Sequence, residues 1–330
     1  RYYSTDCHPK LYGYTMISCT YISQNRSLET SSMRSAIEVS DHMDFISSSV
    51  SSKGYTVFSS YSKIIEDTCK KFGSGVVTMD RVIFLVDMNA FYISCEMARN
   101  TELKGKAAAV AGDPKNRHGI ILAANYEARK FGVKTAMVIH EAKKLCPEIL
   151  LVPPDRELYE NKSREVMDIL SGYSPIVEKN SIDEAWMDLT GCEALFGKPV
   201  DIARSIMKDI MEELDLWCSI GISENKFLSK MASEMKKPLG ITELWKKDIE
   251  EKLWPLPARE MYGIGKQTAK KLADIAIFSI GDIAKSDRRL LSKLFGKYGE
   301  ELYRQANGMD DSPVMENPIH DNKSISRSTT

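Results

Sequence analysis

The run SIDEAWMDLT at residues 181–190 places two adjacent carboxylates, Asp183 and Glu184, at the start of a segment that otherwise has the composition of a buried strand. Adjacent carboxylates in an apolar setting repel each other and are costly to desolvate unless a cation neutralises them. Because Asp and Glu are normally exposed, an acidic pair alone is more often a solvated turn. The pair predicts a metal site only if the fold brings a further acidic side chain beside it.

A second acidic site, much earlier in the chain, meets that requirement. The segment VIFLVDMN at 82–89 is a short apolar run that ends on Asp87, as expected of a buried strand that delivers a carboxylate at its end. Asp87, Asp183 and Glu184 would together offer oxygen ligands to hard cations such as Mg2+. Two such ions suit phosphoryl transfer, since one activates the attacking oxygen and the other stabilises the leaving one.

Composition narrows the class of protein. With 330 residues and 43% apolar content, the chain can form more than one domain with a real core. Its formal net charge of -1 means that any polyanion must be met by a local basic surface. The seven cysteines contain no CxxC pair, which argues against a disulfide framework or a zinc site. With no apolar run of membrane-span length and no signal pattern, we expect a soluble, cytoplasmic protein without membrane association.

The hydrophobic pattern changes along the chain. Residues 1–78 have no sustained period, so we expect a poorly ordered extension there, with a small accessory domain as the alternative. From Met79 onward strands and helices alternate, which predicts a mixed α/β layer. The expected strands are 82–89, 107–111, 120–124, 176–179, 185–189 and 216–222, and the expected helices are 90–99, 126–131, 139–145, 158–174, 200–214 and 224–236.

The C-terminal part has a different character. Residues 261–308 have the pattern of short helices joined by tight connections, and the polar, Pro-containing stretch 310–323 suits a linker. In GIGK at 263–266, a Gly turn opens a basic helix, without the strand or the GK[ST] of a Rossmann or Walker motif. The exposed N–H groups of such a turn, together with Lys266, suit a DNA phosphate. Similar turns also join many ordinary helices.

Two further motifs carry positive charge. In NYEARKFGVK at 125–134, Tyr126, Arg129 and Lys130 share one helix face that could clamp a triphosphate. Taken alone, that face is better explained as a solvated amphipathic surface. Lys237 follows a helical apolar stripe and precedes a proline that disfavours further helix, so it could reach phosphate oxygens. A favourable charge at a helix C-terminus is the commoner role for such a lysine.

Five segments together closely resemble the Y-family translesion DNA polymerases, particularly the bacterial DinB or polymerase IV type. They are DMNAFYISCE (87–96), NYEARKFGVK (125–134), SIDEAWMDLT (181–190), GISENKFLSKMASEMKKPLGI (221–241) and YGIGKQTAKKL (262–272). The resemblance implies a right-hand architecture: an α+β palm with a mixed or antiparallel sheet, small fingers and a helix-hairpin-helix thumb, here lacking the little finger. The implied boundaries are palm 79–90 and 155–244, fingers 91–154, thumb 245–311, linker 312–323, and the first residues of a little finger at 324–330.

The resemblance also implies roles for single residues. Asp87, Asp183 and Glu184 match catalytic metal ligands, joined by the backbone carbonyl of Met88, and Tyr92 matches the steric gate that excludes ribonucleotides. Tyr126, Arg129 and Lys237 match the triphosphate contacts, and Gly263, Gly265 and Lys266 match the thumb contacts to DNA.

Three departures from the family pattern affect these expectations. Asn89 stands where the family often has a second acidic residue, which removes a charge near the site. Ala123 stands where a Ser or Thr hydroxyl often meets the triphosphate, so we expect lower nucleotide affinity. The little finger normally begins near KSISRSTT, where this sequence stops, so we expect much of the template grip and the usual clamp-binding tail to be absent from it.

The function implied by the resemblance is template-directed DNA synthesis of the error-prone, lesion-bypass type. The implied cofactor is a pair of Mg2+ ions and the implied partners are primer–template DNA and a dNTP, with a sliding clamp for the full-length protein and no stable oligomer. A non-catalytic DNA-binding accessory protein on the same fold is the alternative. A palm-type nucleotide cyclase is disfavoured, because the sequence lacks a GG[DE]EF-like turn and a cyclase does not explain the thumb helices.

Overall fold

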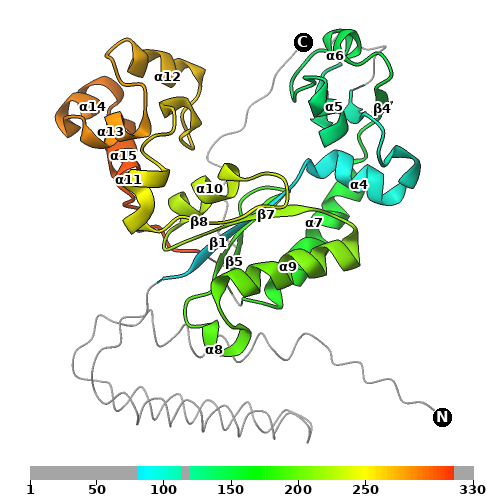
Figure 1. Ribbon diagram of the computed structural model, residues 1–330, viewed down its shortest axis with the longest axis horizontal. Coiled ribbons are helices and arrows are strands. Elements are labelled where there is room, and N and C mark those ends of the chain that lie inside the picture. Colours follow the sequence, from blue (N-terminus) through cyan, green and yellow to red (C-terminus); the bar gives the residue numbers. More distant parts are fainter. Residues whose placement is uncertain (1–80, 113–118, 175, 316–330) are drawn as a thin grey trace, which may run out of the picture. The chain divides into compact units, whose positions relative to one another are not determined.

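The computed structural model describes residues 81–112, 119–174 and 176–315 (Figure 1). The expectations for 1–78 and for 324–330 fall outside these residues. Within them, no helix is long and apolar enough to cross a membrane.

The larger sheet has five strands in the order β5-β6-β1-β7-β8. Its central strand β1 pairs antiparallel with β6 and with β7, and β7 pairs parallel with β8. Every residue of β1 is buried, which explains its continuous apolar sequence, since a strand covered on both faces has no polar side. The strands are β1 (Ile83–Met88), β5 (Val177–Lys179), β6 (Glu184–Asp188), β7 (Cys218–Ser223) and β8 (Ile241–Glu243).

Helices cover both faces of this sheet. Helix α10 (Lys226–Met235) packs on β7 and β1, while α7 (Arg156–Ser171) and α9 (Pro199–Leu214) lie on the opposite face (Figure 1). The close approach of α10 depends on Gly221 in β7, because a Cβ there would lie 1.9 Å from the carbonyl oxygen of Ser229. This packing brings the polar residues of α10 to the end of β1.

A smaller sheet follows β1 in the chain. Its three strands have the order β3-β2-β4, with β2 antiparallel to β3 and parallel to β4. Asn125 ties this sheet to the next helix, because its Oδ1 accepts the N–H groups of Ala128 and Ala108, each at 3.0 Å. The elements are α4 (Phe91–Arg99), η2 (Thr101–Leu103), β2 (Ala108–Ala111), β3 (Ile121–Ala124), α5 (Tyr126–Lys130), α6 (Ile139–Leu145) and β4 (Leu150–Val152).

Short helices form the C-terminal part, and they pack around an apolar core that also includes Phe227 and Leu228 of α10. Leu272, Ile280, Leu291 and Leu302 are fully buried in this core. The elements are η3 (Lys246–Asp248), α11 (Ile249–Lys252), η4 (Ala258–Glu260), α12 (Lys266–Ala273), α13 (Ile280–Lys285), α14 (Arg288–Phe295) and α15 (Lys297–Ala306), and the short α8 (Glu193–Phe196) precedes α9.

Every strand and helix expected between residues 82 and 236 is present. Strands β4 and β8 were not predicted, because three residues are too few to show a period and pairing with β2 and β7 defines them. The expected linker 312–323 begins as a docked segment and not as a free tether. Val314 is only 3% exposed in a cluster with Ile83, Leu85 and Trp186, and residues 316–323 lie outside the described part.

Candidate active site

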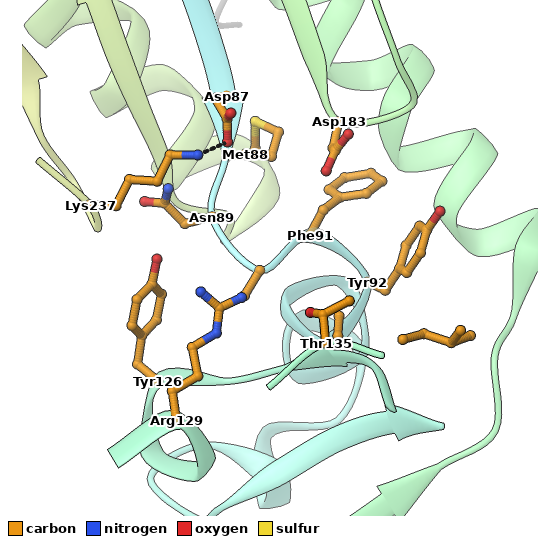
Figure 2. Close-up of a pocket in the computed structure, with 13 residues that line it drawn as sticks. Asp87, Met88, Asn89, Phe91, Tyr92, Tyr126, Arg129, Thr135, Asp183 and Lys237 are labelled. Carbon is orange, nitrogen blue, oxygen red and sulfur yellow. Dashed lines mark ion pairs between the residues drawn. The ribbon is translucent and has the colours of Figure 1, made fainter. Parts of the chain in front are cut away.

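A cavity of about 300 Å³ lies where β1 ends (Figure 2). Segments that are far apart in the sequence line it together, and seven of the predicted site residues are among them. Glu184 and the predicted thumb residues Gly263, Gly265 and Lys266 do not line it. The lining residues are Asp87, Met88, Asn89, Ala90, Phe91, Tyr92, Leu122, Ala123, Tyr126, Arg129, Thr135, Asp183 and Lys237.

Strand pairing brings the acidic segments together. Asp87 is the direct partner of Glu184 in the register of β1 and β6. The N–H of Met88 donates to the carbonyl oxygen of Asp183 at 2.9 Å. The Asp87 and Asp183 side chains approach the cavity from the same side, and Tyr126 and Arg129 approach it from the opposite side (Figure 2).

Two lysines neutralise the acidic side of the site. Lys237 Nζ lies 2.7 Å from Asp87 Oδ1. Lys230 Nζ lies 3.0 Å from Asp87 Oδ2 and 2.6 Å from Glu184 Oε2. Glu234 Oε1 lies 3.0 Å from both ammonium groups. Burial opposes the charge of Lys230, but the surrounding carboxylates outweigh it and raise the pKa of this lysine above its usual value.

Neighbouring polar groups orient the acidic pair further. The Ser181 hydroxyl donates to Asp183 Oδ1 at 2.5 Å, and Asn180 Nδ2 donates to Glu184 Oε1 at 3.2 Å. Both oxygens of Glu184 are therefore engaged by Asn180 and Lys230. In the described part of the chain, no three His, Cys, Asp or Glu side chains are grouped so as to hold a metal ion.

The donor chemistry nevertheless fits a hard divalent cation. Asp87 and Asp183 bring carboxylate oxygens to one cavity, which are the ligands that Mg2+ prefers. Both oxygens of Asp87 already face positive charge, supplied by the ammonium groups of Lys230 and Lys237. The site is thus arranged for cations, and two lysine side chains already contact Asp87 there.

The opposite wall offers an unpaired donor. The Tyr126 hydroxyl is buried and has no hydrogen-bond partner among the described residues. Burial raises the pKa of Tyr126, although the positive charges of Arg129 and Lys237 act against this shift. The Arg129 guanidinium lies 5.0 Å from the centre of the Tyr126 ring, and its Nε donates to the Ala124 carbonyl at 2.9 Å. A buried donor without a protein partner is free to bond an acceptor from a ligand or a water.

Tyr92 is held rigidly at the edge of the cavity. Its ring stacks on Tyr159, with centroids 4.6 Å apart and an interplanar angle of 24°. The Tyr159 hydroxyl donates to Glu96 Oε1 at 2.8 Å, and Arg99 pairs with the other Glu96 oxygen at 2.6 Å. Because its support is fixed in this way, Tyr92 presents a stationary surface to the cavity.

The predicted Gly turn opens helix α12 as expected. Gly263 has a φ of +88°, which favours glycine, and its carbonyl accepts a hydrogen bond from the Tyr298 hydroxyl at 2.8 Å. Gly265 is the N-cap residue of α12, and Lys266 begins the helix. All three predicted residues are exposed, as a contact to a large partner requires.

Lys230 and Glu234 are the main site residues that the sequence analysis missed. Their signal lies in the spacing of α10, because Phe227, Lys230, Met231 and Glu234 share one helix face. Phe227 and Met231 are buried core residues. A lysine on the same face as two core residues is rarely buried without a partner, so this position pointed to an ion pair inside the protein.

The chain is similar to proteins of one family. Residues 86–234 match the impB/mucB/samB family, and residues 246–275 match the IMS family HHH motif. The chain is 65% identical to the DNA polymerase IV of Clostridium kluyveri and 61% identical to that of Alkaliphilus oremlandii, each over 252 residues. Each alignment covers 76% of this chain and 63% of the relative, so the chain spans under two thirds of the length of these proteins.

Solved structures of Y-family polymerases are also similar to this chain. The crystal structure of DinB from Sulfolobus solfataricus is 31% identical, with a TM-score of 0.65 over 71% of this chain and 69% of that one. The insertion ternary complex of Dbh DNA polymerase is 30% identical, with a TM-score of 0.66 and the same coverage. The fold is thus shared over most of this chain, and the chain belongs to the DinB type of the Y family of DNA polymerases.

Proposed function

We propose that this chain carries the catalytic part of a template-directed DNA polymerase of the error-prone, lesion-bypass type. The observation that carries the proposal is the polarity of the cavity. Asp87 and Asp183 lie on one side, and the unpaired Tyr126 hydroxyl and the Arg129 guanidinium lie on the other. A dNTP has a triphosphate for the basic side and a reacting α-phosphate for the acidic side.

Metal dependence is general in the Y family, and we propose that this chain uses two Mg2+ ions. Asp87, Asp183 and the Met88 carbonyl would hold them, together with Glu184 once it leaves Lys230. When bound, such ions make the primer 3′-OH a better nucleophile and neutralise charge on the departing pyrophosphate.

In the proposed reaction the primer 3′-OH attacks the α-phosphate in line, and the bond to the pyrophosphate oxygen breaks. The Tyr126 hydroxyl donates a hydrogen bond to a phosphate oxygen. The planar guanidinium of Arg129 donates two parallel hydrogen bonds to the same phosphate. Lys237, which pairs with Asp87 in this structure, exchanges this partner for a phosphate oxygen. These contacts hold the nucleotide and balance the charge that develops on it.

Tyr92 would act as the sugar gate. Its ring is fixed by Tyr159, so it cannot turn aside for a 2′-OH without breaking a stacked pair. At the thumb, the exposed Gly263 and Gly265 turn and Lys266 would contact the DNA backbone without reading its sequence.

For partners, we propose primer–template DNA and a dNTP, with the chain acting as a monomer in the cytoplasm. The relatives include a protein solved as an insertion ternary complex, which supports this choice. We propose a sliding clamp as a partner of the full-length protein only.

A primer-extension assay tests the proposal. The parent chain, given a templated duplex, Mg2+ and one dNTP, should extend the primer, and Asp183→Ala should abolish extension. Since Asp183 is half-buried and outside any strand, its substitution should leave the unfolding midpoint unchanged. Extension by Asp183→Ala at the parental rate would remove this residue from the metal site.

The same assay distinguishes a polymerase from a non-catalytic DNA-binding protein. Engagement of both Glu184 oxygens by protein groups favours that alternative, because it keeps this acid from the cavity. A parent chain that binds duplex DNA but never incorporates a nucleotide, at any Mg2+ concentration, would establish it.

A further inference from the structure

The Asn89 side chain connects the end of β1 to the turn that carries Lys237. Asn89 is 2% exposed, and its backbone N–H donates to the Trp217 carbonyl at 2.7 Å. Its Oδ1 accepts the N–H of Leu239 at 2.9 Å. That contact determines the orientation of the amide, since only the oxygen can accept from a backbone N–H.

Ser219 completes this connection from the neighbouring strand. It is fully buried in β7, where it is the direct partner of Asp87. Its hydroxyl lies 3.0 Å from Asn89 Nδ2 and 3.2 Å from Asn89 Oδ1, and it also accepts the N–H of Gly240 at 3.3 Å. Asn89, just after β1, and Ser219 in β7 thereby hold two consecutive backbone N–H groups of the turn.

The turn needs this support because its backbone is strained. Leu239 has a φ of +57°, in the left-handed region that non-glycine residues avoid. Gly240 is close to Lys236, since a Cβ at 240 would lie 1.8 Å from the Lys236 carbonyl oxygen. Such a conformation persists only where the surroundings over-determine it.

Lys237 lies within this turn and reaches the site from it. Its ammonium group is 2.7 Å from Asp87 Oδ1, two residues before Asn89 in the chain. Asn89 therefore holds the backbone from which Lys237 extends, while Asp87 receives the end of its side chain. Residues 87–89, at the end of β1 and just after it, therefore position both the backbone and the ammonium group of Lys237.

We propose that Asn89 is a positioning residue, which holds the 237–240 turn through the Leu239 N–H so that Lys237 faces a nucleotide triphosphate. This inference rests on the proposed function of Lys237. An amide suits the task better than a carboxylate. A carboxylate could still accept from Leu239, but it would add a negative charge beside Asp87 and bind Lys237 more tightly, against its transfer to phosphate.

A double-mutant cycle tests the proposal. Asn89→Ala should raise KM for the dNTP by roughly tenfold, and the Kd of the dNTP for the protein–DNA complex by the same factor. The value of kcat should change by less than about twofold. In a Lys237→Met background, Asn89→Ala should add less than about twofold, because the residue acts through that lysine. The proposal is wrong if the double variant shows the product of the two single effects on KM. It is also wrong if a folded Asn89→Ala protein has an unchanged KM.

Ser174→Ala is the matched control. Ser174 is also a buried palm residue whose hydroxyl donates to a backbone carbonyl, that of Asp188 at 2.6 Å, but it does not line the cavity. It should lower the unfolding midpoint without changing KM. Should Asn89→Ala fail to fold, Ser219→Ala removes the second support of the turn and should raise KM by a few fold, again not in the Lys237→Met background.

Measurements of dNTP binding and of primer extension distinguish a failure of the Asn89 inference from a failure of the polymerase proposal. Coupling between Asn89 and Lys237 in the dNTP Kd, in a parent that does not extend primers, retains this inference and rejects the polymerase proposal. Normal extension by the parent, with independent effects of the two substitutions, rejects only the inference. A parent protein to which no dNTP binds rejects both.

Discussion

The Lys230 ammonium group bridges two carboxylates, at 3.0 Å from Asp87 Oδ2 and 2.6 Å from Glu184 Oε2. Its side chain is only 8% exposed, so the bridge lies away from solvent. Without this cation, two acids on paired strands would face each other at close range. The lysine separates the two carboxylates and binds Glu184, which does not line the cavity.

Replacing this lysine should therefore make stability depend on metal. We expect Lys230→Met to lower the free energy of unfolding by about 3 kcal/mol in EDTA, because it leaves Glu184 without a cation and Asp87 with Lys237 alone. Added Mg2+ should recover part of the loss, as measured by denaturant unfolding with and without the ion. Lys252→Met is the control: Lys252 is itself exposed and its partner Asp248, 3.2 Å away, is half-buried, so the loss should stay below about 1 kcal/mol. Equal losses in the two variants, or no response to Mg2+, would contradict this account.

Tyr126→Phe should have opposite effects on stability and on nucleotide binding. The buried hydroxyl has no partner in the described protein, so its removal should raise the free energy of unfolding by about 1 kcal/mol. The same change removes a donor to phosphate and should raise KM for the dNTP several-fold. Thermal unfolding and steady-state kinetics on one preparation measure both. A fall in stability would mean that the hydroxyl has a partner, for example an ordered water.

Tyr92→Ala should weaken discrimination between deoxyribonucleotides and ribonucleotides. The ratio of kcat/KM for dNTP over rNTP is expected to fall by at least about tenfold, since a steric contact to the 2′-OH is lost. Tyr92→Phe keeps the ring on Tyr159 and should retain the parental ratio. Unchanged sugar selectivity in the alanine variant would count against a gate at this position.

Gly221→Ala tests the packing that delivers Lys230. The new Cβ would lie 1.9 Å from the Ser229 carbonyl oxygen, so α10 must shift, at a cost of about 1–3 kcal/mol or more in stability. Primer extension should fall as well, because a shift of α10 also moves Lys230, within the helix, and Lys237, just after it. Gly265→Ala is the control, as a Cβ there meets nothing within 4 Å, and it should change stability by less than about 1 kcal/mol. The idea fails if both variants unfold at the same denaturant concentration.

Much of the secondary structure followed from local patterns. The apolar run of β1 and the amphipathic spacing of α7 and α9 report burial that each segment shows by itself. Asp87 could be placed at a strand end for the same reason. Strand β8 and the docking of Val314 could not be predicted, because they depend on partners that are distant in sequence: β7 in one case and the cluster of Ile83, Leu85 and Trp186 in the other.

The sequence by itself determined which segments carry the acids and bases, because a carboxylate at the end of an apolar strand or a basic helix face is a local property of residue order. Only the tertiary structure decided how these charges are paired. The register of β1 with β6 sets Asp87 beside Glu184, and the close packing of α10 on Gly221 places Lys230 between them. Coulomb interactions depend on the distance between groups and on their burial, and both arise only when distant segments pack together.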